Sequence, residues 1–208
     1  MARGYKWGLG LVVPAVLALG WKYPLIGFVV PVVVISALVT SRFRGRFFCG
    51  NYCPRGSFFD TWLSLSGRRK RFPKFFRSLK LRIPVMLMLF GFMALRIAQD
   101  PGNWRHWGLV FWQMCLVTTI IGISLGLLFR PRSWCALCPV GTLERLIGGG
   151  RSPLAIDSTC VACGICESRC PLQLPIVQDR VAGRITAPDC LKCDACLAAC
   201  PKKAISHT

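Results

Sequence analysis

Long apolar stretches dominate the first 130 residues of this 208-residue chain, and short polar or strongly basic segments separate them. A helix needs about 20 apolar residues to cross a membrane, with a lower limit near 17. The pattern therefore predicts four transmembrane helices, over about residues 5–21, 24–41, 82–98 and 108–129. Two other interpretations stay open: three spanning helices, or one long kinked helix over residues 5–40.

The flanks of the apolar stretches favour separate helices. The sequence from Trp21 to Pro24 is typical of a turn and favours a hairpin over one kinked helix. The first and third stretches are short, so they would borrow flanking aromatic and long basic side chains that extend to the membrane surface: Tyr5, Trp7, Trp21 and Arg82. The basic start of the chain resembles a signal peptide, which we expect to be retained as an anchor.

The distribution of basic residues predicts the orientation of these helices. The loop over residues 42–81 holds eleven lysines and arginines, with Asp60 as its only acidic residue. Cytoplasmic loops of membrane proteins are rich in lysine and arginine. We therefore expect a multi-pass protein of the inner (cytoplasmic) membrane, with both termini and this loop in the cytoplasm. The connection over residues 99–107 would lie on the opposite side.

Composition excludes two broad classes of protein. A mean hydropathy of +0.49 with 53% hydrophobic residues is too apolar for a soluble ferredoxin. The net charge of +19 is concentrated in residues 1–150, which hold 20 Lys and Arg against 3 Asp and Glu, and no nucleic-acid recognition motif accompanies it. We therefore expect membrane lipid, and no nucleic acid, among the partners.

Two cysteine motifs near the C-terminus carry the clearest chemistry. Residues 160–171 and 190–201 both have the spacing C-x2-C-x2-C-x3-C-P, which is typical of [4Fe–4S] ligation. In such pairs the fourth cysteine of one motif ligates the cluster of the other motif. The spacing predicts one cluster held by Cys160, Cys163, Cys166 and Cys200, and a second held by Cys190, Cys193, Cys196 and Cys170. Structural zinc would use sets of four cysteines instead of a run of three plus one.

The glycine run at residues 148–150 predicts a boundary between two domains. Residues 1–148 would form a four-helix transmembrane anchor. Residues 149–208 would form an α+β ferredoxin domain of the bacterial 2[4Fe–4S] type, so the whole protein is predicted to be mainly α. A core of this size would depend on its clusters for stability.

Four further cysteines follow the cytoplasmic ends of two predicted helices. They lie in two turns, over residues 49–56 and 135–141, and each turn ends in Cys-Pro-x-Gly: Cys49, Cys53, Cys135 and Cys138. Two helices followed by one cysteine turn thus occur twice, as in an internal repeat. The four thiols form a candidate third site, for a metal ion, an iron–sulfur cluster or a redox-active dithiol. Packing of the helix ends is the alternative, and Cys115 is expected to be a packing residue.

Paired Cys-Pro turns after transmembrane helices, followed by a tandem [4Fe–4S] motif, resemble a known family. It comprises the membrane polyferredoxins typified by the quinol-dehydrogenase component of periplasmic nitrate reductase (NapH-type). The turn at Cys135 has one residue fewer than the C-x3-C-P usual in that family. The resemblance implies passage of electrons between the quinone pool and other redox proteins.

The expected function is a non-catalytic electron-transfer subunit of a membrane-bound respiratory oxidoreductase complex, with quinone and other subunits as partners. An assembly factor that reduces a metal or disulfide for a client enzyme, or a redox sensor, is the alternative. A quinone could bind near the cytoplasmic cysteine turns or beside the polar residues of the 96–107 segment: Arg96, Gln99, Asp100, Arg105 and His106. An interfacial aromatic belt is the simpler explanation of that segment.

Overall fold

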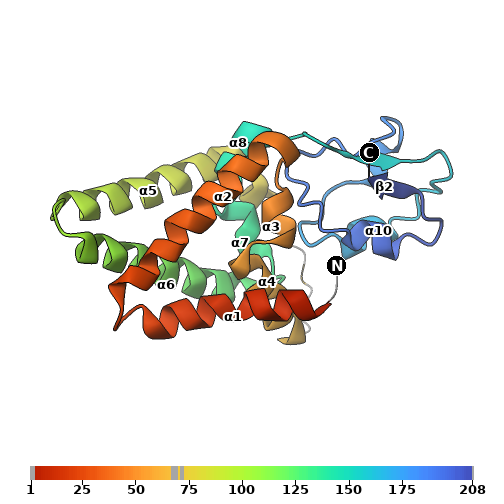
Figure 1. Cartoon of the computed structure of the whole chain (residues 1–208). Helices are drawn as coiled ribbons and strands as arrows, with labels where there is room; N and C mark the ends of the chain where they lie inside the picture. The colour runs from red at the N-terminus through yellow and green to blue at the C-terminus, as the bar shows by residue number, and fades with distance from the viewer. Residues whose placement is uncertain (1–2, 67–69, 71–72, 208) are drawn as a thin grey trace.

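Long helices form one end of the molecule and a small cysteine-rich part forms the other (Figure 1). The computed structural model describes residues 3–66, 70 and 73–207. The long helices are α1 (Arg3–Leu19), α2 (Val29–Arg44, which follows a 3-10 helix over Pro24–Phe28), α5 (Leu79–Ala98) and α6 (Trp104–Leu128). The basic residues Arg68, Arg69 and Arg71 of the long loop lie outside the described residues.

All four predicted stretches are helical, and three of the described helical segments are long and apolar enough to cross a membrane. These are Pro24–Arg44, Leu79–Ala98 and Trp104–Leu128. Large apolar side chains stand exposed on each of them, such as Val32, Leu95 and Ile120, and such surfaces suit contact with lipid. Helix α1 has 17 residues, which is the lower limit for a span.

The chain turns sharply between α1 and α2, so residues 5–40 do not form one kinked helix. The backbone N–H groups of Lys22 and Tyr23 both donate to the Leu19 carbonyl oxygen and close the end of α1. The turn is packed tightly on α6, because a Cβ atom on Gly27 would lie 2.0 Å from the Gly108 carbonyl oxygen. Beyond the turn α1 and α2 diverge (Figure 1), and α1 packs on α4 while α2 packs on α8.

Short helices form the layer between the long helices and the cysteine-rich part (Figure 1). They are α3 (Phe47–Asn51), α4 (Pro54–Thr61), α7 (Ser133–Leu137) and α8 (Pro139–Gly148). Helices α4 and α8 both begin with the proline of a Cys-Pro pair, where the missing N–H costs nothing and the fixed φ suits a helix. Two 3-10 helices over Leu63–Ser66 and Lys74–Arg77 lie along the basic loop before α5.

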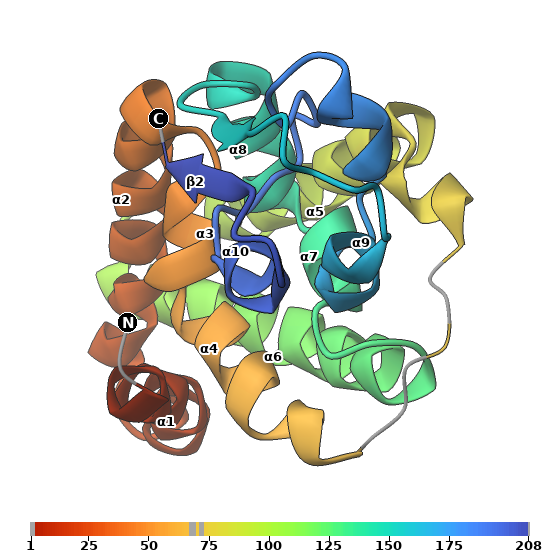
Figure 2. The same ribbon diagram turned by 90° about the vertical axis from the view of Figure 1, so that its right-hand side faces the viewer.

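The cysteine-rich part contains little regular structure. Its strands β1 (Leu154–Ile156) and β2 (Ile205–His207) pair antiparallel, with Ile156 opposite Ile205. Between them come α9 (Ile165–Arg169), a 3-10 helix over Val177–Arg180, and α10 (Ala195–Ala199). Helices α9 and α10 pack against each other, and Figure 2 shows both on the face turned away from the long helices.

One carboxylate joins the two parts of the molecule. Asp189 of the cysteine-rich part accepts hydrogen bonds from Arg46 at 2.7 Å, from Arg82 at 2.8 Å and from Arg145 at 2.5 Å. The expectation that Arg82 extends to the membrane surface was therefore wrong, because its side chain is fully buried and bound to Asp189. The Asn51 side chain adds a hydrogen bond to the Lys192 carbonyl oxygen at 3.1 Å.

Candidate functional site

Each four-cysteine set of the ferredoxin-like part lines its own small cavity. Cys160, Cys163, Cys166 and Cys200 line one cavity, and Cys170, Cys190, Cys193 and Cys196 line the other. The contact between α9 and α10 produces this exchange, because it places the cysteine that follows each helix beside the other motif. The ligation of one cluster by each set stays a prediction, and these two cavities are where the clusters would lie.

The two motifs also share an unusual backbone conformation. Three pairs of equivalent residues adopt positive φ, namely Ala162 and Lys192, Gly164 and Asp194, and Gln173 and Lys203. Five of these six residues have a side chain, and a left-handed conformation costs such a residue about 1–2 kcal/mol. Ligation of a cluster inside each loop would offset this cost, since metal binding contributes directly to the folding free energy of small domains.

Burial changes the acidity of the thiols that line the inner cavity. Burial raises the pKa of Cys190 to about 11 and that of Cys196 to about 12, and such thiols lose their proton when a metal binds. Among the described residues, no three His, Cys, Asp or Glu side chains form a group that could hold one metal ion. A cubane cluster is larger than one ion, so its ligands stand further apart.

The two cavities differ in their distance from the long helices. The set that includes Cys170 and Cys196 is largely buried, and Leu191 beside it contacts α3 so closely that a Cβ atom on Gly50 would lie 1.9 Å from the Leu191 carbonyl oxygen. The other set includes the exposed Cys163. The set with Cys170 and Cys196 therefore faces the long helices, and the set with Cys163 faces outward.

The four remaining motif cysteines come together where the two cysteine turns meet. Cys49 and Cys135 are buried in the same apolar core as Cys170 and Cys196. Cys53 and Cys138 are half-buried and line a larger cavity on the side of the long helices. The candidate third site thus lies between the ferredoxin-like part and the long helices, in contact with both.

Two arginines at equivalent positions hold the cysteine turns together. Arg46 and Arg132 each stand three residues before the first cysteine of their turn. Arg46 donates to the Cys135 carbonyl oxygen at 2.8 Å, and Arg132 donates to the Cys49 carbonyl oxygen at 2.9 Å. Sequence reasoning missed this pair, although the matching Arg-x-x-Cys order in both turns was a signal that could have identified it.

The two turns also resemble each other at the glycine that follows each Cys-Pro pair. The backbone N–H of Gly56 lowers the pKa of the Cys53 thiol, and the backbone N–H of Gly141 acts in the same direction on the pKa of Cys138. A Cβ atom at position 141 would lie 2.3 Å from Arg46 Nη2, so a larger residue there would have to displace the Arg46 guanidinium. Backbone N–H groups directed at sulfur stabilise a thiolate.

Ionisation of the four thiols depends on their neighbours. The Cys49 thiol donates a hydrogen bond that lowers the pKa of Cys53 to about 6 although burial opposes it, and the pKa of Cys49 itself is raised well above its ordinary value. Burial raises the pKa of Cys135 to about 12 and also raises the pKa of Cys138. Cys53 is therefore the most readily ionised of the four thiols.

The charges around the thiols are mainly positive. Arg46 and Arg132 are both buried, and Arg55 lines the adjoining cavity. Burial raises the pKa of the nearby Glu144 to about 7, so this carboxyl carries only part of a negative charge at neutral pH. An oxidised [4Fe–4S] cluster with four thiolates carries roughly two negative charges, and the residues present therefore fit an iron–sulfur cluster.

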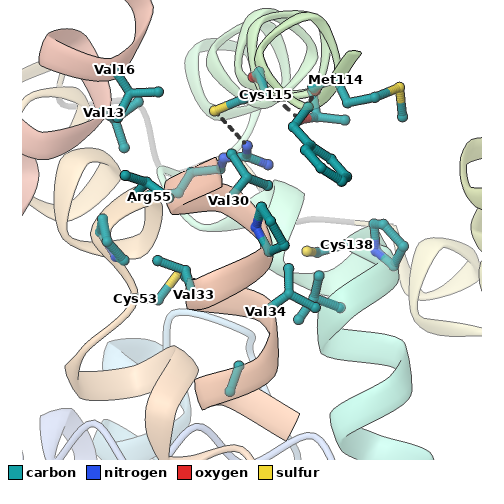
Figure 3. A pocket seen from close by; sticks show the side chains of 18 of the residues that line it. Val13, Val16, Val30, Val33, Val34, Cys53, Arg55, Met114, Cys115 and Cys138 are labelled. Carbon is teal, nitrogen blue, oxygen red and sulfur yellow. Dashed lines mark hydrogen bonds between the residues drawn. The ribbon is translucent and has the colours of Figure 1, made fainter. Parts of the chain in front are cut away.

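Cys115 and Arg55 form a contact that the sequence did not indicate. Cys115 is buried in α6, as expected, but it also accepts a hydrogen bond from Arg55 Nη2 at 3.3 Å. Figure 3 shows the guanidinium of Arg55 pointing toward Cys115 inside the larger cavity. The 96–107 segment does not line that cavity. In that segment Arg105 stacks over Trp104, and His106 is hydrogen-bonded to the Arg96 carbonyl oxygen. These contacts join the end of α5 to the start of α6.

Comparison with protein families agrees with the division of the chain. Residues 26–73 and again residues 109–154 match a family model described as a 4Fe-4S binding domain, and these two segments contain the two cysteine turns. Residues 159–205 match a model described as a 4Fe-4S dicluster domain. The chain therefore contains 4Fe-4S ferredoxin-type domains, which indicate bound iron–sulfur clusters. The first family model matches each of the two copies of the helix-and-turn repeat.

Similar proteins extend the resemblance over most of the chain. The uncharacterized proteins MJ0749 and MJ0750 of Methanocaldococcus jannaschii are 25% and 24% identical, covering 94% and 84% of this chain and 82% and 77% of their own lengths. A protein named "Putative electron transport protein YccM" of Escherichia coli is 25% identical over 81% of this chain, which spans 52% of that protein. No solved structure matches this chain.

Proposed function

We propose that this protein is a NapH-like, membrane-anchored iron–sulfur subunit that relays electrons between the quinone pool and partner redox subunits. The observation that carries the proposal is the linear order of three four-cysteine sets. The set with the exposed Cys163 lies outermost, the largely buried set with Cys196 follows, and the cysteine turns adjoin the long helices. The YccM relative, named as an electron transport protein, supports this class of function.

The lining of the two small cavities supports an assignment of cysteines to two of the clusters. One [4Fe–4S] cluster would be ligated by Cys160, Cys163, Cys166 and Cys200, and a second by Cys190, Cys193, Cys196 and Cys170. Cys49, Cys53, Cys135 and Cys138 would ligate a third. When bound, such clusters supply one-electron oxidation and reduction. The protein holds them in sequence and, through Asp189 and its arginines, fixes the outer part against the membrane part.

The anchor of the proposed subunit has four spans. Helix α1 begins beside α4, where Lys6 forms an ion pair with Asp60 at 3.3 Å. It ends beside the first third of α6, where the Trp112 indole donates to the Leu17 carbonyl oxygen at 3.2 Å. It therefore extends over much of the distance covered by α6. With four spans and the basic loops on the cytoplasmic side, both termini and the ferredoxin part would lie in the cytoplasm.

Iron and acid-labile sulfide analysis of the purified full chain tests the number of clusters. Three clusters require about twelve iron atoms and twelve sulfides per chain. The variants Cys53→Ser and Cys138→Ser should each reduce both numbers to about eight, while the EPR signals of the two outer clusters persist. A wild-type content of about eight would show that the turns hold no cluster and act as thiols.

Reduction by a quinol tests the relay. Oxidation of one decylubiquinol yields the quinone, two electrons and two protons, with the electrons taken singly by two clusters and the protons passing to water. Addition of decylubiquinol, or of the quinone to reduced protein, should change the cluster EPR spectrum in wild type and fail to do so in Cys53→Ser. Equal exchange in both proteins would contradict the proposed path.

A further inference from the structure

A cavity of about 260 Å³ lies on the membrane side of the cysteine turns. Helices α1, α2, α5 and α6 supply its walls through valine, leucine, phenylalanine and methionine side chains. Cys53 and Cys138, which belong to the candidate third site, line this cavity and are labelled in Figure 3. Because the surroundings are long apolar helices, a ligand that enters from the side must be soluble in the membrane.

Arg55 is the only Lys, Arg, His, Asp or Glu among the described residues that line this cavity. Its side chain makes one hydrogen bond to another described residue, to Cys115 Sγ, and sulfur is a weak acceptor. No carboxylate of the described residues forms an ion pair with it, in contrast to the paired Arg46 and Arg132. A charge at such a position is costly, and in membrane proteins it marks a functional site.

The geometry points to a quinone head bound in this cavity, with Arg55 donating a hydrogen bond to a ring carbonyl oxygen. This assignment rests on the proposed function and adds the location of its quinone. A planar apolar ring with a carbonyl oxygen uses both the apolar walls and the free N–H groups of the guanidinium. The fixed positive charge also attracts the electron density that grows on that oxygen as the ring is reduced.

The position of the cavity agrees with this ligand better than with the alternatives. A ring in the cavity would lie next to Cys53 and Cys138, and thus next to the third cysteine set of the proposed relay. The polar 96–107 segment does not line the cavity. A lipid acyl chain would fill the apolar space but would offer no acceptor to the Arg55 guanidinium. A buried charge without such an acceptor is unfavourable.

Binding of decylubiquinone to the purified full chain in detergent tests the site. Arg55→Gln should weaken binding about tenfold to a hundredfold, the effect expected for one charge-assisted hydrogen bond, while Arg55→Lys should lose less. Val34→Phe fills the cavity without changing a charge and should also weaken binding. Arg105→Gln is the matched control, because Arg105 is exposed at the far end of α6, and it should bind as wild type does.

Two further measurements separate this inference from the proposed function. Iron content and reduction by dithionite should be unchanged in Arg55→Gln and Val34→Phe, which excludes loss of the clusters. If wild type binds decylubiquinone and both cavity variants bind it equally well, the cavity assignment is overturned and the proposed function stands. If wild type contains its clusters but binds no decylubiquinone, and retains only lipid on native mass spectrometry, both the cavity assignment and the quinone link of the proposed function fail.

Discussion

Arg46 donates a hydrogen bond to the carbonyl oxygen of Cys135, 89 residues further along the chain. Arg132 donates the equivalent hydrogen bond to the carbonyl oxygen of Cys49. The two repeats of helices and cysteine turn therefore complete each other, because each supplies the arginine that fixes the other's first cysteine. A site built in this way requires both repeats to be folded and packed before the four thiols are in place.

Replacement of Arg132 should destabilise this junction strongly. Arg132 is buried, and it also binds Asp60 through Nε at 2.7 Å and Nη2 at 2.6 Å. Arg132→Gln removes the hydrogen-bond donor of the Cys49 carbonyl oxygen and leaves the partly exposed Asp60 carboxylate with its ion pair to Lys6, at a cost of about 3 kcal/mol. Arg132→Lys should be nearly as harmful, because an ammonium cannot reproduce the planar contacts of the guanidinium.

Thermal unfolding in detergent measures this effect. The control is Arg105→Gln, which removes an exposed guanidinium stacked over Trp104 and should cost less than about 1 kcal/mol. If Arg132→Gln unfolds at the same temperature as this control, the contacts of Arg132 do not stabilise the protein.

Loss of the Asp189 carboxylate should weaken the attachment of the ferredoxin part. Asp189→Asn has nearly the same shape, but it leaves the fully buried Arg46 and Arg82 without their shared counter-ion. Breaking a buried ion pair from one side costs about 3–5 kcal/mol. We expect a lower unfolding temperature and faster proteolysis near residues 149–153, where the chain passes between the two parts. The matched change Asp157→Asn, at an exposed residue, should leave both unchanged.

The sequence allowed the cysteine chemistry to be predicted because it depends on local spacing. Two residues between cysteines define a loop around a cluster, and a proline after the fourth cysteine marks its end. The apolar stretches likewise predicted the positions of the long helices to within a few residues. The grouping of Cys170 with the later motif depends on a known pattern of exchange, and the cavities show the same grouping.

Contacts between distant segments were not predictable in this way. Asp189 binds Arg46 over 143 residues and Arg82 over 107 residues, and no local signal distinguishes these arginines from the solvated ones of the same basic loop. Arg82 was placed at the membrane surface because the third apolar stretch is short and a flanking basic side chain was expected to extend it. The cavity with Arg55 and Cys115 arises because α1 and α2 diverge after their turn, and hydrophobic periodicity does not determine the angle between two helices.

A single methyl group at Gly50 should disturb the contact between α3 and the second cysteine motif. A Cβ atom there would lie 1.9 Å from the Leu191 carbonyl oxygen, which is backbone and cannot rotate away. Gly50→Ala should therefore lower the unfolding temperature and alter the EPR signal of the cluster assigned to Cys190, Cys193, Cys196 and Cys170. Gly91→Ala is the matched control in a helix, because no atom lies within 4 Å of its added Cβ, and it should be neutral or slightly stabilising. Equal stability of the two variants would contradict the close packing.

The outer cluster should be the first to be lost under oxidation. Cys163 is exposed and the rest of its set is half-buried, whereas Cys170 and Cys196 of the inner set are buried against the membrane part. Oxidants reach a cluster through its exposed ligands, and a buried thiolate set is protected by the surrounding core. After brief treatment of the intact protein with ferricyanide, iodoacetamide followed by mass spectrometry should label Cys160, Cys163, Cys166 and Cys200 before the other motif cysteines. Simultaneous labelling of both sets would show that the packing against α3 gives the inner cluster no protection, and earlier labelling of the inner set would reverse the order proposed for the relay.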